Sequence, residues 1–493
     1  MKMKIHKLII TILSTLALLL VLSCSDATDI KQDSELNETV AIRNLEDLQS
    51  TLNSVYASYG PDFGGNGTGD VIYYNAIFSD NLKAGAANNG QGSQAYGHLV
   101  DISGSSISEF LWPNRYLTIF RANIALNAIK NLNFDSEEMA TVNHIKGQLL
   151  ALRALAHFDL FEYFTTDYTN DNALSVINVD FVPTISDQLE RNTVKETLDF
   201  IKSDLNEALS LLDPTNDTTS SPFYINADFI NALKVNIALL EGDYSATILS
   251  MADQLLNKYP LANQSQYFNI FSDLSNAEVI FKLSRVNGSN TVGDLFYFNE
   301  VRPADAYLEV SNDLYNELSA VPNDVRFFVN VEAQSTFIAP NDPNNSLLIG
   351  KYPGSSDGRQ VNDIKIMRSS EILLIKAEMQ ARNNMLTQAA TSIQQLRNAR
   401  VGSTQPLPVY NNLNAALLDI LKERRKELCF EGQRFLDLKR LGGELNIGIT
   451  RLSVDCESFG TSCNLAANNF RFTLGIPQSE LDGNRVITQN PGY

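Results

Sequence analysis

The sequence predicts an all-α protein in which helices pair and stack into a superhelix, with long loops and minor β-hairpins between them. Apolar residues recur three and four positions apart in four long segments, which is the spacing of one face of an α-helix. These segments are residues 42–59, 107–131, 137–164 and 193–212. Because each helix has an apolar stripe to bury against a neighbour, the pattern favours a packed helical assembly.

Two later segments have the pattern of helix–turn–helix pairs. In the earlier pair, the apolar stripe from Phe229 to Leu240 leads into the turn Glu241-Gly242-Asp243-Tyr244, and a second stripe ends at Pro260. In the later pair, Asn383-Asn384 separates the two stripes. A Gly-Asp-Tyr turn with a terminal proline resembles a tetratricopeptide unit of about 34 residues. Such pairs cannot bury their faces alone, so several should stack into a tetratricopeptide-like helical-repeat superhelix.

Long segments rich in Gly, Asn, Ser and Tyr separate the helices, at residues 60–105, 261–310 and 320–366. Loops of this length within a compact protein are either functional or disordered. Tyr and Phe alternate here with Asn and Gly, which favours packed loops that bind a ligand.

The amino terminus has the pattern of an export signal. Residues 1–23 combine a basic start with an apolar run, Leu8 to Leu22, that is too short for a convincing membrane span. The run ends in Ser23-Cys24, which resembles a bacterial lipobox, so we expect cleavage before Cys24 and lipidation of that residue. Residues 24–40 would then be the lipidated cysteine and a flexible tether to the membrane. The alternative is an ordinary secretory signal with an incidental cysteine.

Charge and composition exclude several classes of function. The 493 residues hold 38 basic and 57 acidic side chains, a net charge of −19, and removal of the signal would take three lysines away. A nucleic acid would be repelled by this field, so no nucleic-acid partner is expected. Four His and four Cys leave little material for a metal cluster. We therefore expect no cofactor and no metal site, and leave open a structural calcium ion in a loop.

The cysteines beyond the signal have separate expected roles. Cys456 and Cys463 lie seven residues apart in a polar segment, and an exported protein meets an oxidising compartment, which favours a disulfide between them. Cys429 falls in an apolar helical context and is expected to be a buried thiol.

Motifs of catalysis are incomplete. Residues 354–358 fit G-x-S-x-G, but a polar segment follows them and every histidine lies upstream, so they are expected to form a turn. Gly90-Gln91-Gly92 loosely fits a dinucleotide fingerprint without the strand that should precede it. Glu427 and Glu431 suggest acid–base chemistry, but neighbouring arginines favour ion pairs on the surface of a helix or partly buried. We predict that the protein is not an enzyme; a surface-anchored hydrolase is the alternative.

Several motifs in order identify a family. The carboxy-terminal motifs are Arg368–Glu378, Glu423–Arg440, Ile476–Leu481 and Gln489–Tyr493. The amino-terminal half adds Trp112, Tyr116, Ile119 and Asn123, and then Leu152-Arg153-Ala154 with Phe158-Asp159-Leu160. Together they closely resemble the SusD/RagB family of Bacteroidetes outer-membrane lipoproteins. The resemblance covers roughly residues 24–493, with Arg485 in place of a common proline and Val401 in place of a usual alanine.

The resemblance implies a SusD-like lipoprotein with a helical region at 41–225 and a carboxy-terminal region at 226–493. It implies a lipid-anchored location in the outer membrane, facing the cell exterior. Members act as the lid of a SusC-like TonB-dependent transporter and capture nutrients, usually oligosaccharides. Two alternatives stay open: a RagB-type lid that binds oligopeptides, and a tetratricopeptide adaptor for protein partners.

The expected ligand site lies in the loops. Sugar binding commonly uses an aromatic ring stacked on a pyranose, but the single tryptophan, Trp112, is in a motif helix and is expected in the core. The aromatic candidates are therefore Phe63, Tyr73, Tyr74, Tyr96, Phe296, Tyr297, Phe298 and Tyr307. Candidate polar partners are Asp80, Asn81, Asn88, Asn89, Gln91 and Gln94. The alternative is that at least half of these aromatics are core residues, with Ile72 and Tyr73 alternating in a short strand.

Overall fold

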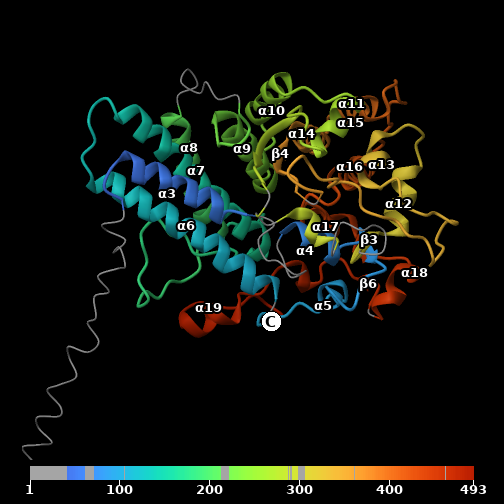
Figure 1. Ribbon diagram of the computed structural model, residues 1–493, viewed down its shortest axis with the longest axis horizontal. Helices are drawn as coiled ribbons and strands as arrows, with labels where there is room; N and C mark the ends of the chain where they lie inside the picture. Colours follow the sequence, from blue (N-terminus) through green and yellow to red (C-terminus); the bar gives the residue numbers. More distant parts are fainter. Residues whose placement is uncertain are drawn as a thin grey trace, which may run out of the picture.

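A computed structural model gives the architecture. It describes residues 42–60, 71–104, 106–212, 221–286, 288, 291–297, 306–359, 361–460 and 462–493. Over these ranges the chain forms seventeen α-helices, three 3-10 turns and three two-stranded antiparallel sheets (Figure 1). The predicted all-α class is confirmed. None of the helices described is both long enough and apolar enough to cross a membrane.

The amino-terminal helices pack side by side, and the four predicted from periodicity are all present. The helices of this part are α3 (Leu45–Ser58), α4 (Val71–Phe78), α5 (Ser93–Tyr96), α6 (Ile107–Asn131), α7 (Met139–Phe164) and α8 (Val194–Leu211), and the predicted four are α3, α6, α7 and α8. Long helix α7 lies between α6 and α8, and α3 covers α6 and α7. Side-chain caps fix where helices begin. At the start of α8, the Thr193 side chain accepts the N–H of Glu196, and the Glu196 carboxylate accepts the N–H of Thr193. Ile72 and Tyr73 lie in α4, so the alternation that suggested a strand belongs to a buried helix.

The helix pairs predicted from the two turns are also present. The middle of the chain holds α9 (Ala227–Glu241), α10 (Ala246–Lys258), α11 (Gln264–Phe271), α12 (Asn312–Ser319), α13 (Val325–Asn330), α14 (Ser369–Arg382) and α15 (Leu386–Val401). The pairs α9–α10 and α14–α15 stack, because α14 contacts both α9 and α10. Gly242 ends α9 in the left-handed conformation, with φ of 81°, as the cap of a tight turn requires.

The remaining elements lie toward the carboxy terminus or join distant segments. The helices are α16 (Leu413–Leu428), α17 (Arg434–Leu445), α18 (Ser453–Cys456) and α19 (Gln478–Gly483), and the 3-10 turns are η1 (Val292–Leu295), η2 (Glu457–Phe459) and η3 (Phe470–Phe472). The paired strands are β1 (Leu82–Ala84) with β3 (Leu308–Val310), β2 (Val279–Leu283) with β4 (Ile364–Arg368), and β5 (Ile449–Thr450) with β6 (Asn464–Leu465). The register places Leu82 opposite Val310 and Val279 opposite Arg368.

Residues 75–81 are held by hydrogen bonds with residues 425–451. The Asn75 side chain accepts the backbone N–H of Phe435 at 3.0 Å. The buried guanidinium of Arg451 donates to the backbone carbonyls of Ile77, Phe78 and Ser79. These contacts satisfy carbonyls at the end of α4 that have no partner within the helix. They also fasten the amino-terminal third of the chain to its carboxy-terminal part.

The left-handed cap of α9 gives the first prediction. Replacing Gly242 with alanine adds a Cβ that meets only the Tyr244 hydroxyl, at 3.9 Å, so the cost is backbone strain of about 1–2 kcal/mol. We expect urea unfolding of Gly242→Ala to show that loss. Gly483→Ala is the control, because its added Cβ meets nothing within 4 Å and its φ is not positive. Equal stability of the two variants would contradict the assignment of the cap.

Candidate functional site

The two loops expected to bind a ligand meet in space. Strands β1 and β3 pair, and the backbone contact continues beyond them: the N–H of Gly85 donates to the Tyr307 carbonyl at 2.9 Å, and the N–H of Ala87 donates to the Ala306 carbonyl at 2.8 Å. The Asn88 side chain also donates to the Tyr307 carbonyl, at 3.0 Å. We call the surface formed by residues 84–94 and 306–307 the loop platform.

The loop platform presents amide side chains on a fixed turn. Asn89 and Gln94 are exposed, and Asn88 and Gln91 are half-buried. Internal hydrogen bonds hold the turn: the Asn88 side chain accepts the N–H of Gly90 at 2.9 Å, and Gln91 accepts the N–H of Asn89. An amide offers a donor and an acceptor together, which suits a pair of sugar hydroxyls.

Glycine is required where the turn meets α4. Gly92 has φ of 73°, and an added Cβ would stand 2.0 Å from a methyl of Ile77 and 2.3 Å from the Tyr73 hydroxyl. The Tyr73 ring thus lies directly beneath the loop platform. Its side chain supports the turn from inside.

Five of the aromatic candidates lie in the core instead of on the surface. Their exposed fractions are at most 4 %, for Tyr73, Tyr74, Tyr96, Phe296 and Tyr297. Burial on several sides explains this: Tyr74 packs on Phe78 and Phe435, and Phe296 stacks on Tyr352. In this structure none of the five rings presents a face to a ligand, which corrects their interpretation as an exposed stacking platform. Tyr307 is half-buried at the loop platform, and Phe63, Phe298 and Cys24 lie outside the described residues.

The polar candidates Asp80 and Asn81 have structural partners. The Asp80 carboxylate accepts two hydrogen bonds from Arg434, at 2.9 and 2.7 Å, and Asn81 accepts one from Arg425 at 3.0 Å. Burial alone would raise the pKa of Asp80, but the two guanidinium groups of Arg425 and Arg434 hold it far below its usual range. Both side chains are buried, so they orient the start of β1 and do not face a ligand.

Three expectations about single residues are confirmed. Trp112 is buried, and its indole N–H donates to the Glu480 carboxylate at 3.1 Å. Cys456 and Cys463 form a disulfide, and Cys429 is a buried free thiol whose pKa burial raises to about 11. The expectation that the protein has no metal site stays a prediction; among the residues with assigned positions, no three His, Cys, Asp or Glu side chains gather to hold a metal.

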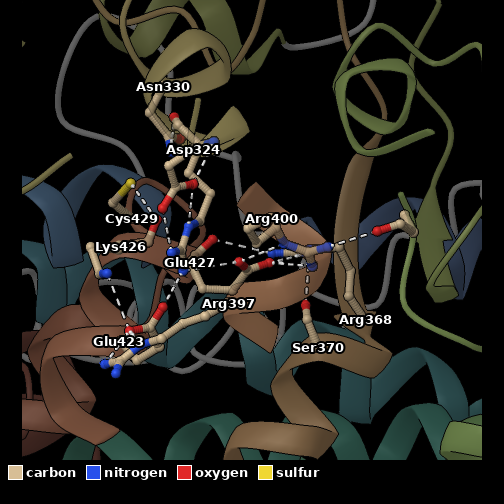
Figure 2. A network of polar contacts seen from close by, with 12 residues as sticks. Asp324, Asn330, Arg368, Ser370, Arg397, Arg400, Glu423, Lys426, Glu427 and Cys429 are labelled. Atoms are coloured by element: carbon tan, nitrogen blue, oxygen red, sulfur yellow. Dashed lines mark hydrogen bonds and ion pairs between the residues drawn. The ribbon is translucent and has the colours of Figure 1, made fainter. Parts of the chain in front are cut away.

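The charged motif Glu423–Arg440 contributes to a buried ion network around Glu427 (Figure 2). Arg400 donates to both carboxylate oxygens of Glu427, at 3.0 and 2.9 Å, and Arg368 donates to one, at 3.0 Å. The same two arginines contact Glu278, at 2.8 and 3.1 Å. The side chains of Glu427, Arg400 and Glu278 are fully buried, so the network lies deeper than the helix-surface or partly buried ion pairs that the motif predicts.

A second branch of the network centres on Glu423, one turn earlier in α16. Arg326 contacts it at 2.6 Å and also binds Asp324 through two hydrogen bonds. Arg397 and Lys426 contact the other carboxylate oxygen of Glu423, at 2.8 and 3.2 Å. Each of these acids is thus saturated by cations, which leaves none poised to accept a proton from a substrate.

Comparisons with known proteins agree with the motifs. A model of the SusD family matches residues 323–493, and a model described as starch-binding and associating with the outer membrane matches residues 28–223. SusD-like protein P38 of Formosa agariphila is 23 % identical, covering 89 % of this chain and 92 % of its own. A SusD superfamily crystal structure from Bacteroides thetaiotaomicron is 25 % identical with a TM-score of 0.76, covering 91 % of this chain and all of its own. The chain belongs to the SusD/RagB family.

A further structural neighbour is a laminarin-binding SusD-like protein, 20 % identical with a TM-score of 0.67 over 92 % of this chain and all of its own. The laminarin-binding neighbour and the family model that matches residues 28–223 are described by the carbohydrate that they bind and not by a catalytic activity, and that model is described as associating with the outer membrane. The motif Glu423–Arg440 therefore belongs to the scaffold of the SusD/RagB fold. Sequence reasoning did not single out Glu278, which ends the turn before β2 with φ of 65°. The signal that the sequence offers for Glu278 is an acidic residue directly before a short apolar strand.

The network gives the second prediction. Glu427→Gln removes the charge that balances two buried guanidinium groups, so we expect the free energy of unfolding to fall by about 3–5 kcal/mol. Glu444→Gln is the matched control, since Glu444 is 37 % exposed and pairs with Arg382, and should lose less than about 1 kcal/mol. Chemical denaturation monitored by circular dichroism measures both. Similar losses in the two variants would contradict a central role for Glu427.

Acid should destabilise the fold through the same residues. Burial alone would raise the pKa of Glu427 and of Glu423, but Arg400 and Arg368 around the former, and Arg326 and Lys426 around the latter, hold both well below 4.5. The unfolded chain binds more protons below that pH, so the stabilisation is complete above about pH 5 and is lost as the pH falls. We expect urea midpoints of the wild type to drop between about pH 5 and 4, and less steeply in Glu427→Gln. A midpoint that rises toward acid pH would refute this account.

Proposed function

We propose that this chain is a lipid-anchored, cell-surface protein that binds oligo- or polysaccharides for nutrient uptake. The observation that carries the proposal is the loop platform, where two distant loops bring a partly exposed tyrosine and exposed amides together on a SusD/RagB scaffold. Rings stack on the apolar face of a sugar, while amides match its hydroxyls. The laminarin-binding neighbour supports a glucan among the ligands to be tried first.

The anchor and the partner form the second part of the proposal. The lipobox-like Ser23-Cys24 supports lipidation of Cys24 after removal of the signal, which would hold the protein at the outer membrane facing the exterior. There it would close as a lid over a SusC-like TonB-dependent transporter. The chain would need no cofactor for this task, because it holds its ligand without breaking a bond.

A glycan panel tests the binding role. We expect purified residues 25–493 to bind at least one of laminarihexaose, maltoheptaose, xylohexaose and mannohexaose in calorimetry. Tyr307→Ala and Gln94→Ala should each weaken that binding about 3- to 10-fold, since a ring contact or a hydrogen bond contributes about 0.5–1.5 kcal/mol. The matched controls are Phe328→Ala and Gln388→Ala, which replace exposed residues outside the loop platform and should bind as the wild type does.

A second binding experiment tests the competing ligand class, oligopeptides. The burial of Trp112 removes the largest stacking side chain, which makes an oligopeptide ligand of the RagB type the main competitor. A tryptic digest of casein is the probe. Binding of the peptide mixture without binding of any glycan would reject the glycan proposal.

A further inference from the structure

A polar pocket of about 360 Å³ opens beside the sheet formed by β2 and β4. Four segments contribute to its lining: Phe223 before α9, residues 272–276 after α11, residues 282, 284 and 285 around the end of β2, and residues 355–357 and 363 before β4. The volume is within the range of sites that hold small molecules. None of the lining residues belongs to the loop platform.

The floor of this pocket is rigid and electrically balanced. Lys282 pairs with Asp363 at 2.8 Å, and Asp273 pairs with Lys365 at 2.6 Å. Asp363 also accepts the backbone N–H of Arg285 at 2.9 Å, which fixes the end of β2. Each of these charges has an opposite partner, and the two other charged residues of the lining, Arg285 and Asp357, are of opposite sign. The lining therefore gives no strong net attraction to an ion. The pocket is therefore suited to a neutral polar molecule.

The walls offer both kinds of contact that a sugar ring needs. Hydroxyl and amide groups line one part, contributed by half-buried Ser275 and Ser355 and by exposed Asn276 and Ser356. The half-buried ring of Phe223 and the exposed side chain of Leu274 supply apolar surface. A pyranose has hydroxyls around its edge and C–H groups on its faces, so it matches this division.

The turn at residues 354–358 forms part of the wall and is held in place. The N–H of Ser355 donates to the Gly358 carbonyl at 2.9 Å, and the N–H of Gly354 donates to the Asn362 side chain at 2.8 Å. Asn362 in turn donates to Asp273 at 2.9 Å. Gly354 has φ of 93°, and an added Cβ would stand 2.4 Å from a backbone oxygen of Arg359. The segment that matches G-x-S-x-G is thus a turn fixed by hydrogen bonds, as predicted, and it places Ser355 and Ser356 at the pocket.

We propose that this pocket is a second carbohydrate-binding site, which takes one or two sugar residues of a neutral glycan. The inference rests on the proposed glycan-binding function and adds a site of its own. Two sites on one chain hold a polymer more tightly than either alone, because the second contact becomes intramolecular. The pocket would therefore contribute most with long glycans.

The test uses calorimetry and affinity electrophoresis on residues 25–493. The neutral probes are laminarihexaose, maltoheptaose, xylohexaose and mannohexaose with their parent polysaccharides, and trigalacturonate is the anionic probe. Asn276→Ala removes an amide, and Ser356→Trp blocks the mouth from an exposed position. We expect Asn276→Ala to weaken binding of a neutral ligand about 3- to 10-fold, the effect of one lost contact, and Ser356→Trp to weaken it at least as much, because it excludes the ligand from the whole pocket. Ser403→Trp, at an exposed position away from the pocket, is the matched control.

The outcomes separate this proposal from the binding function itself. If the wild type binds a neutral glycan and both pocket variants bind it with unchanged affinity, the second site is refuted while the glycan-binding function stands. If the variants weaken only trigalacturonate, the neutral class is refuted. If the wild type binds none of the probes, the glycan-binding function fails and the pocket proposal fails with it. Unchanged thermal unfolding of both variants establishes that a loss of affinity comes from the pocket.

Discussion

The buried carboxylate of Glu427, shared between Arg400 and Arg368, is the interaction on which the rest of the structure depends. Charges removed from water are tolerated only when partners and hydrogen bonds surround them. Here the requirement draws the end of α15, the end of β4 and the turn before β2 onto one face of α16. These elements must therefore take up their positions together.

Helix α16 transmits this constraint to the loop platform. Glu423 and Glu427 lie in the network, while Arg425, between them, reaches Asp80, Asn81 and the acidic start of α12. Asp80 and Asn81 immediately precede β1, whose pairing with β3 builds the loop platform. The network thus fixes the loop platform indirectly. The proposed binding role requires such rigidity, because affinity depends on side chains that are already in place.

Sequence periodicity was sufficient for the long helices and insufficient for the surface. Helix α6 occupies the predicted residues 107–131 because neighbouring residues along the chain set its apolar stripe and its caps. Helix α4 is apolar over most of its length, so its sequence pattern does not show which of its side chains are exposed to a ligand. Tyr74 packs on Phe435, which is more than 350 residues away in the sequence. The pairing of Asp80 with Arg434 spans 354 residues and is equally invisible to local pattern.

The hold of Arg451 on the carbonyls at the end of α4 has a consequence for how the protein reaches its native state. The groups that close the core around residues 75–81 are synthesised more than 340 residues after them. Contacts between such distant segments form slowly, because the chain loses the entropy of closing a long loop before the contacts stabilise it. The amino-terminal helices can form early, but their core stays open until α16, α17 and Arg451 are available. Folding is therefore completed after most of the chain has been made. Until then, residues 75–81 lack the contacts that fix them in the native structure.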